Sequence, residues 1–459
     1  MSVPSGDVTE EEVRPERTNT RPPCAYLFRV FEWELSKPVA ARHRLQGLHE
    51  VELGRGDRQS EVQARPGGSC LRLQLPDRWT STVHARLARQ GSSFRLEDVD
   101  SKNGTWVNGE AQDRRDLKDL DLIEVGHALY LYRAELPWTA QASLERAEVK
   151  APLPGLVTLN PMLAAQFERL PAIATSNVPV ILHGETGTGK EVLSSAIHQL
   201  SGRSGTFTAV NCAALPKALV ESELFGYRKG AFSGATEDRL GLVRSADQGT
   251  LLLDEIGDLS PEAQGALLRV LQESEVTPLG ATKPVKVDVR IVAATHRDLP
   301  EMVAKGLFRA DLLARLSGFT VRLPPLRERK EDLAFLIETL LTRIAPGRTL
   351  RFEADAARAL FRHKWPLNVR ELEKCLSSAV ALTPGEEIAL TSLPEDVQKA
   401  LGAEPLPELD GDERKARLLA LLNTHNGNVT AVAQALDLSR MQVHRWIRRY
   451  AIDVGSFRK

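Results

Sequence analysis

The chain has 459 residues, of which 42% are hydrophobic and 26% charged, and its formal net charge is −1. This balance is typical of a globular protein of about two to four domains and excludes a uniformly basic nucleic-acid-binding protein. No apolar run approaches the ~18 residues of a membrane helix, so we expect no membrane association. The four cysteines lie far apart without a C-x-x-C pair, which argues against a disulfide scaffold or zinc module and predicts a soluble, cytoplasmic protein.

The N-terminal quarter of the sequence predicts a tail followed by a β-sandwich. Residues 1–23 are polar and rich in proline, which is typical of disorder. From residue 24 to 133 the pattern is short and alternating: Leu71, Leu73 and Leu75 are separated by single polar residues, and Leu129 and Leu131 repeat the same period. Several short strands bounded by Gly and Asn turns indicate a sandwich.

Three segments of this region carry chemistry: Leu53-Gly54-Arg55, Ser81-Thr82-Val83-His84, and the stretch from Asp98 to Gly109. With them, residues 24–133 resemble a forkhead-associated (FHA) domain, a β-sandwich that binds phosphothreonine. Phosphothreonine has about −1.5 to −2 charges and three acceptor oxygens, which suit an arginine with hydroxyl and amide donors. The resemblance implies phosphate contacts from Arg55, Ser81, Thr82, Lys102 and Asn103.

The partner implied by this domain is a phosphothreonine-containing protein, such as a Ser/Thr kinase or its substrate. The threonines of the chain's own tail are a second source of the same ligand. A sandwich kept only for protein interaction or oligomer packing is the alternative.

The rest of the chain divides by composition into an α/β domain and a small basic end. Apolar runs such as Val178–Leu182 and Thr250–Leu253 alternate with helical stretches, which predicts a parallel sheet. Proline-containing polar stretches predict linkers on both sides of this domain. The predicted segments are a linker at 134–155, the α/β domain at 156–388 with a helical lid at about 326–388, a second linker at 389–410, and an all-α domain at 411–459.

A glycine-rich loop follows the strand at Val178–Leu182 and opens a helix, the arrangement of a phosphate-binding loop. Glycines let the backbone N–H groups approach phosphate oxygens, and a lysine reaches the β- and γ-phosphates. The predicted ATP-binding residues are Gly184, Glu185, Thr186, Gly187, Thr188, Gly189, Lys190 and Glu191.

The second half of the predicted ATP site is the end of the strand Thr250–Leu253, where Asp254 and Glu255 follow directly. Two adjacent carboxylates at the end of a buried strand are costly unless they meet a cation or a water. We expect Asp254 to hold Mg²⁺ through water and Glu255 to polarise the attacking water. ATP and Mg²⁺ are therefore the predicted cofactors.

Residues 221–235, which read ESELFGYRKGAFSGA, resemble the signature loop of bacterial sigma-54-dependent transcriptional activators. These are AAA+ ATPases, also called enhancer-binding proteins, and the resemblance runs from about Leu156 to the C-terminus. It implies that Phe232, Ser233 and Gly234 contact sigma-54 RNA polymerase holoenzyme, and that ATP hydrolysis drives this contact.

The same resemblance implies roles for five further residues. Asn211 matches the residue that switches the Walker B glutamate, Thr295 matches sensor I, and Arg370 matches sensor II on the lid. Arg309 and Arg315 match arginine fingers offered to the neighbouring subunit. An arginine supplied in trans implies a homo-oligomeric ring.

The C-terminal residues have helix-turn-helix proportions and resemble the Fis-type domain that ends these activators. Val443, Trp446, Ile447 and Tyr450 form a stripe at helical spacing that we expect to pack inward. A paired module implies an upstream DNA site with two-fold symmetry. The predicted DNA-binding residues are Arg440, Gln442, His444, Arg445, Arg448 and Arg449.

Two alternatives to a sigma-54 activator remain open. The family pattern has Thr where this chain has Ser233, so the chain could be an AAA+ DNA-binding regulator or repressor that does not engage sigma-54. The other alternative is a phosphopeptide-binding adaptor with a vestigial ATPase, against which the intact Lys190, Asp254 and Glu255 argue.

Overall fold

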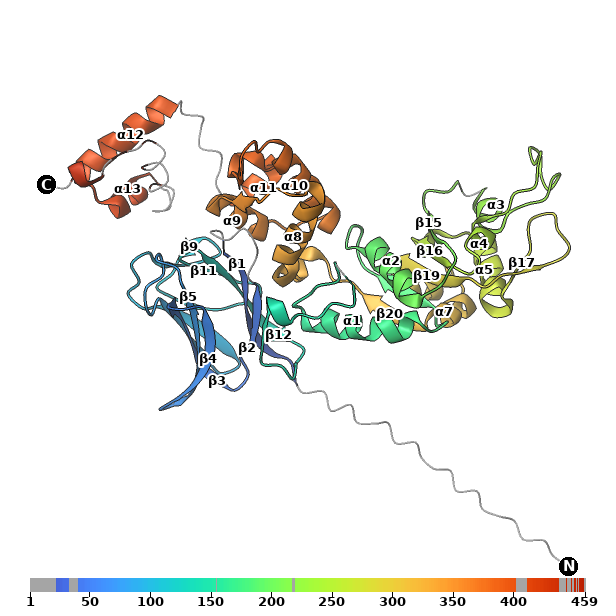
Figure 1. Ribbon diagram of the computed structural model, residues 1–459, viewed down its shortest axis with the longest axis horizontal. Helices are drawn as coiled ribbons and strands as arrows, with labels where there is room; N and C mark the ends of the chain where they lie inside the picture. The colour runs from blue at the N-terminus through green and yellow to red at the C-terminus, as the bar shows by residue number, and fades with distance from the viewer. Residues whose placement is uncertain are drawn as a thin grey trace, which may run out of the picture. The chain divides into compact units, whose positions relative to one another are not determined.

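The computed structural model describes residues 22–32, 40–153, 155–216, 219–401 and 411–436, and positions 443, 447, 450, 452 and 454–457 (Figure 1). These residues belong to two compact units, Met1–Gln398 and Lys399–Lys459, and each unit is described by itself. All but the last two residues of the predicted tail lie outside the described residues. Within the described ranges, every helix is too short or too polar to cross a bilayer.

The N-terminal segment folds as the predicted sandwich of two sheets, with strand orders β13-β2-β1-β12-β11-β8-β9 and β10-β7-β6-β3-β5-β4 (Figure 1). The predicted alternation is confirmed in β5, where Leu71, Leu73 and Leu75 are buried in the core and the polar residues between them are partly exposed. The strands are β1 (Cys24–Glu32), β2 (Ala41–Arg44), β3 (Leu48–Arg55), β4 (Gln59–Arg65), β5 (Gly68–Leu75), β6 (Ala85–Gln90), β7 (Ser93–Asp98), β8 (Thr105–Val107), β9 (Glu110–Ala111), β10 (Arg114–Asp116), β11 (Leu122–Val125), β12 (Ala128–Leu136) and β13 (Ser143–Glu145).

Strand β12 is buried on both faces, which the period of two does not reveal. Tyr130 and Tyr132 belong to the core between the sheets. Leu129 and Leu131 therefore lie on the outer face, because side chains alternate along a strand, yet they are also buried. The outer face of this sheet is covered by the helical lid, as Phe31 of the neighbouring β1 shows by its contacts with two lid phenylalanines.

The segment predicted as the first linker adds an edge strand to the sandwich. Strand β13 pairs antiparallel with β2, with Ser143 opposite His43 and Leu144 opposite Arg42. A short 3-10 helix, η1 (Arg146–Glu148), follows it.

The α/β domain contains the predicted parallel sheet, in the order β15-β16-β19-β14-β20. Both faces are covered: Leu251 and Leu253 pack in one apolar core, and Leu252 packs in a second core that also contains residues of α1 and α2. The elements are α1 (Pro161–Ala174), β14 (Val180–His183), α2 (Lys190–Ser201), β15 (Phe207–Asn211), α3 (Val220–Phe225), α4 (Leu242–Ser245), β16 (Thr250–Asp254), η2 (Ile256–Asp258), α5 (Pro261–Glu273), β17 (Glu275–Val276), β18 (Val285–Lys286), β19 (Arg290–Thr295), α6 (Leu299–Ala304), α7 (Ala310–Leu316) and β20 (Phe319–Arg322).

The helical segment after β20, which we call the lid, continues to residue 399. Helices η5 and α11 lie in the stretch that the sequence predicts as the second linker. The elements of the lid are η3 (Leu326–Glu328), η4 (Lys330–Asp332), α8 (Leu333–Ile344), β21 (Arg351–Phe352), α9 (Ala354–Arg362), α10 (Asn368–Ala381), β22 (Glu387–Ile388), η5 (Leu390–Ser392) and α11 (Glu395–Lys399).

Two buried ion pairs join the sandwich to the lid. Arg133 Nη1 donates to both carboxylate oxygens of Glu331, at 2.9 and 2.8 Å. Arg358 donates to Glu124 through Nε at 2.7 Å and Nη2 at 2.5 Å. All four side chains are buried, and each arginine also binds a carboxylate of its own domain, Asp119 for Arg133 and Asp355 for Arg358.

The C-terminal unit contains α12 (Gly411–Thr424) and α13 (Val429–Ala435), which share an apolar core. Val443 and Ile447 are buried in this core, which confirms the predicted inward packing of these two positions. Tyr450 packs against it, and Trp446 lies outside the described residues.

The Arg358–Glu124 pair generates a prediction about stability. Arg358→Met leaves the buried Glu124 carboxylate without its cation, so we expect the free energy of unfolding to fall by about 3–5 kcal/mol. The double variant Glu124→Leu/Arg358→Met should recover part of this loss, because it removes the charge of Glu124, while the buried Asp355, which Arg358 also binds, keeps its carboxylate. Urea denaturation measures both values.

The control is Arg343→Met, because the Arg343–Glu373 pair lies on the surface with its two side chains 62% and 45% exposed. Surface pairs contribute about 0–1 kcal/mol, so this variant should unfold near the parent midpoint. Equal losses in Arg358→Met and in the double variant would contradict a buried, mutually dependent pair.

Candidate functional site

The predicted ATP-site residues meet at one edge of the parallel sheet. The register places His183 beside Thr295 and Asn211 beside Asp254, so the carboxyl ends of β14, β15, β16 and β19 lie side by side. The glycine-rich loop begins directly after His183, and its Gly184 amide donates to the Thr295 carbonyl at 3.1 Å. The sheet thus brings the loop, both carboxylates and the sensor I candidate together, as the sequence predicts.

Lys190 is buried within its own loop. Its Nζ donates to the carbonyls of Gly184 and Glu185, at 2.9 and 3.3 Å, and lies 3.6 Å from Glu255 Oε1. These contacts hold the cation at the sheet edge, beside the two carboxylates. An ammonium group in this position can exchange the carbonyls for phosphate oxygens.

Asp254 occupies the last position of β16 and is half-buried. Burial raises the pKa of its carboxyl; Lys190 opposes the rise, and Glu255 adds to it. A carboxylate that is partly desolvated and shares one lysine with its neighbour suits a divalent cation, so the residues fit Mg²⁺.

Glu255 has a left-handed backbone, with φ of 53° and ψ of 51°. This conformation is uncommon for a residue with a side chain and is concentrated at functional sites. Its Oε2 lies 2.8 Å from Nδ1 of His296, a contact that the sequence motifs did not predict. The sequence feature that could have indicated this contact is the position of His296 directly after the sensor I candidate Thr295.

The lid contacts the phosphate-binding loop through residues that the sequence motifs also did not predict. Arg327 donates to both carboxylate oxygens of Glu185, at 2.8 and 2.6 Å. Arg329 donates to the Thr188 carbonyl at 2.7 Å, and Asn368 Nδ2 donates to the Thr186 carbonyl at 3.0 Å. No local spacing in the sequence announces these pairings, because the partners lie more than a hundred residues apart.

The remaining candidates around this edge are placed as follows. Asn211 accepts hydrogen bonds from the Ala213 and Ala214 amides through its Oδ1. Thr295 is fully buried, and its hydroxyl accepts from the Arg297 amide. Glu191 is exposed in the first turn of α2, and Gly189 begins that helix with φ of 105°.

Sensor II candidate Arg370 is exposed on α10 at the lid's approach to the loop. A Cβ at Gly187 would lie 3.1 Å from Arg370 Cβ and 2.3 Å from the Leu367 carbonyl. Only glycine fits at position 187 while the lid is this close.

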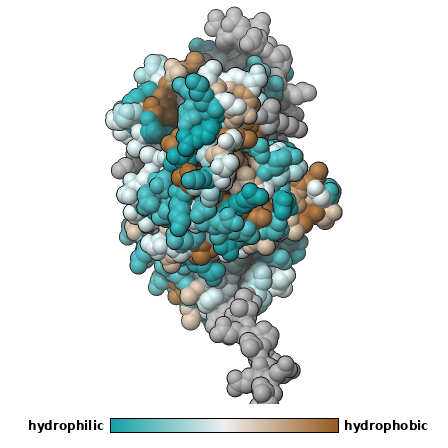
Figure 2. All heavy atoms as spheres, turned by 90° about the vertical axis from the view of Figure 1, so that its right-hand side faces the viewer, coloured by the Kyte–Doolittle hydropathy of each residue, from teal (hydrophilic) through white to brown (hydrophobic). Residues whose placement is uncertain are grey.

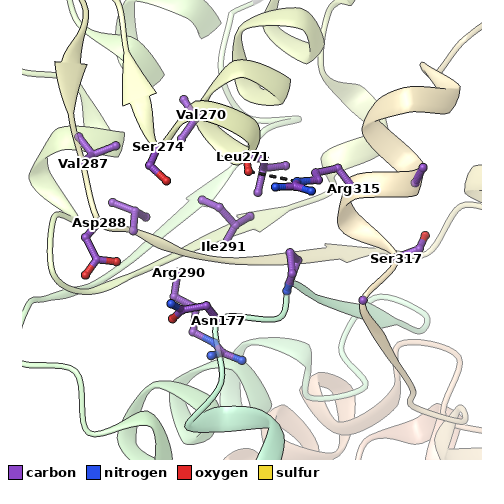
Figure 3. A pocket seen from close by; sticks show the side chains of 14 residues that line it. Asn177, Val270, Leu271, Ser274, Val287, Asp288, Arg290, Ile291, Arg315 and Ser317 are labelled. Atoms are coloured by element: carbon purple, nitrogen blue, oxygen red, sulfur yellow. Dashed lines mark hydrogen bonds between the residues drawn. The ribbon is translucent and has the colours of Figure 1, made fainter.

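The two candidate arginine fingers are exposed at either end of α7. Arg309 forms a bidentate pair with Asp311, at 3.0 and 2.7 Å. Arg315 donates to the Leu271 carbonyl at 3.2 Å, in a hollow of about 370 Å³ also lined by Ser274, Ile291 and Ser317 (Figure 3). Among the described residues, neither guanidinium makes a hydrogen bond to the phosphate-binding loop.

The signature loop presents Phe232 between glycines. Its side chain is 41% exposed and packs edge-to-face on Tyr227, with ring centroids 4.9 Å apart. Gly230 and Gly234 have positive φ values of 83° and 106°, and Ser233 and Gly234 are exposed. Seen from the end of the α/β domain that carries β17, the surface is mostly hydrophilic with small hydrophobic patches (Figure 2).

The candidate phosphothreonine residues lie at one end of the sandwich, Arg55 as the last residue of β3 and the others on loops. The Arg55 amide donates to the Ser81 carbonyl at 2.9 Å, and the Lys102 amide donates to Ser81 Oγ at 3.2 Å. Asn103 Nδ2 donates to the Trp79 carbonyl at 2.7 Å, and Thr82 is exposed. The structure therefore brings together all five residues that the resemblance implies.

Buried polar contacts fix the shape of these loops. His84 Nδ1 accepts from the Ser81 amide, and its Nε2 lies 3.1 Å from the Gly104 carbonyl. Burial lowers the pKa of His84, which favours the neutral ring that this pairing needs. Gly54 allows the closest approach: a Cβ there would lie 2.1 Å from the Thr82 carbonyl.

The predicted DNA contacts Arg440, Gln442, His444, Arg445, Arg448 and Arg449 all lie outside the described residues. The described α13 matches the first helix of the predicted helix-turn-helix.

Four family models match the chain in order. They are the FHA domain over residues 51–126, the sigma-54 interaction domain over 156–322, the AAA+ ATPase lid domain over 327–407 and a homeodomain-like domain over 412–453.

Similar curated proteins are transcription regulators. GlrR of Escherichia coli K12 is 40% identical over 309 residues, covering 66% of this chain and 70% of GlrR. ZraR of Salmonella typhimurium is 40% identical over 335 residues, covering 71% and 74%. The acetoin catabolism regulatory protein of Cupriavidus necator is 38% identical over 459 residues, covering 96% of this chain but only 64% of the relative.

A similar solved structure is NtrX from Brucella abortus in complex with ADP, which is 31% identical with a TM-score of 0.50 and covers 65% of this chain and 70% of NtrX. The described sheet edge, with its glycine-rich loop and paired carboxylates, lies within the residues that the sigma-54 interaction domain matches. With an FHA domain before this ATPase and a helix-turn-helix domain after it, the chain belongs to the family of sigma-54-dependent transcriptional activators.

Proposed function

We propose that the chain is a sigma-54-dependent transcriptional regulator that uses ring-dependent ATP hydrolysis to remodel sigma-54 RNA polymerase holoenzyme at promoters in the cytoplasm. Phosphothreonine recognition by the FHA domain controls it. The observation that carries the proposal is an ATP site with loop, lysine and both carboxylates in one chain that also presents an exposed phenylalanine on a glycine-flanked loop.

ATP hydrolysis in this proposal uses the contacts at the sheet edge. The loop amides bind the phosphates, and Lys190 leaves the carbonyls of Gly184 and Glu185 for the β- and γ-phosphate oxygens. Glu255 orients and polarises the attacking water. Asp254 would hold Mg²⁺ through water, and the ion would supply neutralisation of the charge that develops on the phosphates.

The proposed assembly of the chain into a ring rests on the two candidate arginine fingers. Arg309 and Arg315 are exposed and bind groups of their own domain, so they are available to a neighbouring subunit and not to their own ATP. An arginine that reaches across a subunit boundary would neutralise the growing phosphate charge and make hydrolysis depend on assembly.

The first prediction from this assignment concerns Glu255. Glu255→Gln keeps the shape of the side chain but cannot polarise water, so ATP binding should persist and hydrolysis should fall by about a hundredfold or more. Phosphate release and binding of a fluorescent nucleotide measure the two effects. Lys190→Ala is the matched variant and should weaken the binding of the nucleotide itself. A Glu255→Gln protein that still hydrolyses ATP would contradict the role assigned to Glu255.

Contact with sigma-54 is assigned to Phe232, Ser233 and Gly234. Exposure of an aromatic ring costs free energy in water, and its burial against a partner recovers it. The loop's glycines permit it to change conformation with the nucleotide state.

The prediction is that Phe232→Ala abolishes a complex of the full chain with sigma-54 formed in ADP and a transition-state fluoride, measured by size-exclusion chromatography. ATPase activity should persist, because Phe232 lies outside the ATP site. Leu382→Ala, which removes another exposed apolar side chain, is the control and should leave the complex intact. No complex with the parent chain would instead favour the regulator that does not engage sigma-54.

Phosphothreonine binding is assigned to Arg55, Ser81, Thr82, Lys102 and Asn103. The side chains of Arg55 and Lys102 are exposed and make no hydrogen bond or ion pair with other described residues. Two unpaired cations beside hydroxyl and amide donors suit a dianionic phosphate.

The FHA domain can influence the ATPase because a chain of contacts joins them. Asp77 accepts from the Thr80 hydroxyl and from the His127 amide, which ties the candidate phosphate loop to the β11–β12 turn. These two strands carry Glu124 and Arg133, which pair with the lid. We assign control of the ring to this route.

Arg55→Ala should weaken binding of phosphothreonine peptides by about ten- to a hundredfold, the value of a lost hydrogen bond between charged groups. Calorimetry with a phosphothreonine peptide pool and its unphosphorylated counterpart tests this. Lys118→Ala removes an exposed cation in the turn between β10 and β11, before the end of β11 that lies away from His127, and should have no effect. Equal binding of both peptide pools by the parent would contradict phosphate recognition.

DNA binding is assigned to the C-terminal unit, with Arg440, Gln442, His444, Arg445, Arg448 and Arg449 as the contacts. The match to a homeodomain-like domain over 412–453 and the basic composition of the last residues support it. We expect an upstream site with two-fold symmetry.

A further inference from the structure

We infer that His296 is a positioning residue for ATP hydrolysis, which holds the carboxylate of Glu255 through a hydrogen bond from Nδ1. The inference rests on the proposed role of Glu255 in polarising the attacking water. His296 lies at the tip of β19, directly after the buried Thr295, so it connects the sensor I strand to the carboxylate.

The geometry of Glu255 requires such a partner. Its left-handed backbone turns the side chain toward the end of β19, where Oε2 meets His296 Nδ1 at 2.8 Å and Oε1 lies 3.6 Å from Lys190 Nζ. The Glu255 side chain is only 12% exposed, so solvent can satisfy little of its charge. Each carboxylate oxygen therefore has one cationic or hydrogen-bonding group facing it.

Nucleotide binding removes one of these two partners. In the proposed mechanism Lys190 turns to the phosphates, which leaves His296 as the group that fixes the carboxylate. Asn211 does not replace it here, because its described side-chain contacts are those of Oδ1 with the Ala213 and Ala214 amides, and its amide nitrogen makes no described bond to Glu255. Among the described side chains, His296 is the one that hydrogen-bonds to Glu255.

The neighbouring residue on the same loop has a different role. Arg297 pairs with Asp258 at 2.5 Å, and its amide donates to the Thr295 hydroxyl. These contacts hold the loop without touching Glu255. His296 and Arg297 can thus be separated by substitution.

The test uses the full chain at one high concentration, so that assembly is constant. His296→Ala should lower the rate of ATP hydrolysis at saturation by about ten- to a hundredfold, because a carboxylate misplaced by about 1 Å loses this much. The affinity for a fluorescent ATP analogue should stay unchanged, since His296 binds no part of the nucleotide. His296→Asn should restore most of the rate, because its amide nitrogen can donate from a similar position.

Arg297→Gln is the control for disturbance of the loop and should hydrolyse ATP near the parent rate. In the Glu255→Gln background, adding His296→Ala should have no further effect, because the two residues act as a unit.

An unchanged rate in His296→Ala, a matching loss of nucleotide affinity, or failure of the Asn variant to recover would each overturn the inference. A Glu255→Gln protein that still hydrolyses ATP would overturn the proposed function of Glu255 instead.

Discussion

The placement of one lysine between its own loop and a pair of carboxylates is the interaction on which the ATP site depends. Lys190 is buried, bonded to two loop carbonyls and 3.6 Å from Glu255. A buried ammonium group is stable only where such partners surround it. The parallel sheet supplies them, because its strands end at one edge and deliver both carboxylates beside the loop.

The same balance of charge bears on the proposed need for a neighbouring subunit. One lysine and two acidic residues face the position of a highly anionic ligand, so more positive charge is needed there during hydrolysis. Within the described residues, the two candidate arginine fingers bind elsewhere: Arg309 binds Asp311 and Arg315 binds a backbone carbonyl. The chemistry therefore favours a site completed by Mg²⁺ and by a neighbouring subunit.

Sequence reasoning predicted the parts of the fold and site that are local. The glycine-rich loop, the carboxylate pair and the sandwich strands each have their own spacing or period, and the structure has them where they were expected. The contacts of Arg329 with the loop and of Arg133 with Glu331 could not be predicted, because no period relates residues so far apart. The leucines of β12 have the predicted period of two, but that period does not reveal that they are buried on the face away from the sandwich core.

The buried ion pairs between the sandwich and the lid affect the specificity of this interface more than its stability. Such pairs add little net stability, since removing two charges from water costs about as much as their attraction returns. They do, however, penalise every other arrangement in which the charges are buried unpaired. An interface of this kind is specific without being strongly stabilising.

That property suits a regulatory contact better than a purely structural one. Glu331 is bonded to Arg133 of the sandwich, and two residues earlier Arg329 is bonded to the phosphate-binding loop. A change at the sandwich can reach the loop only if this short segment, η4 and the residue before it, has a second arrangement of similar free energy. For the proposed control by the FHA domain, its ligand has to shift this equilibrium by the difference in its affinity for the two arrangements.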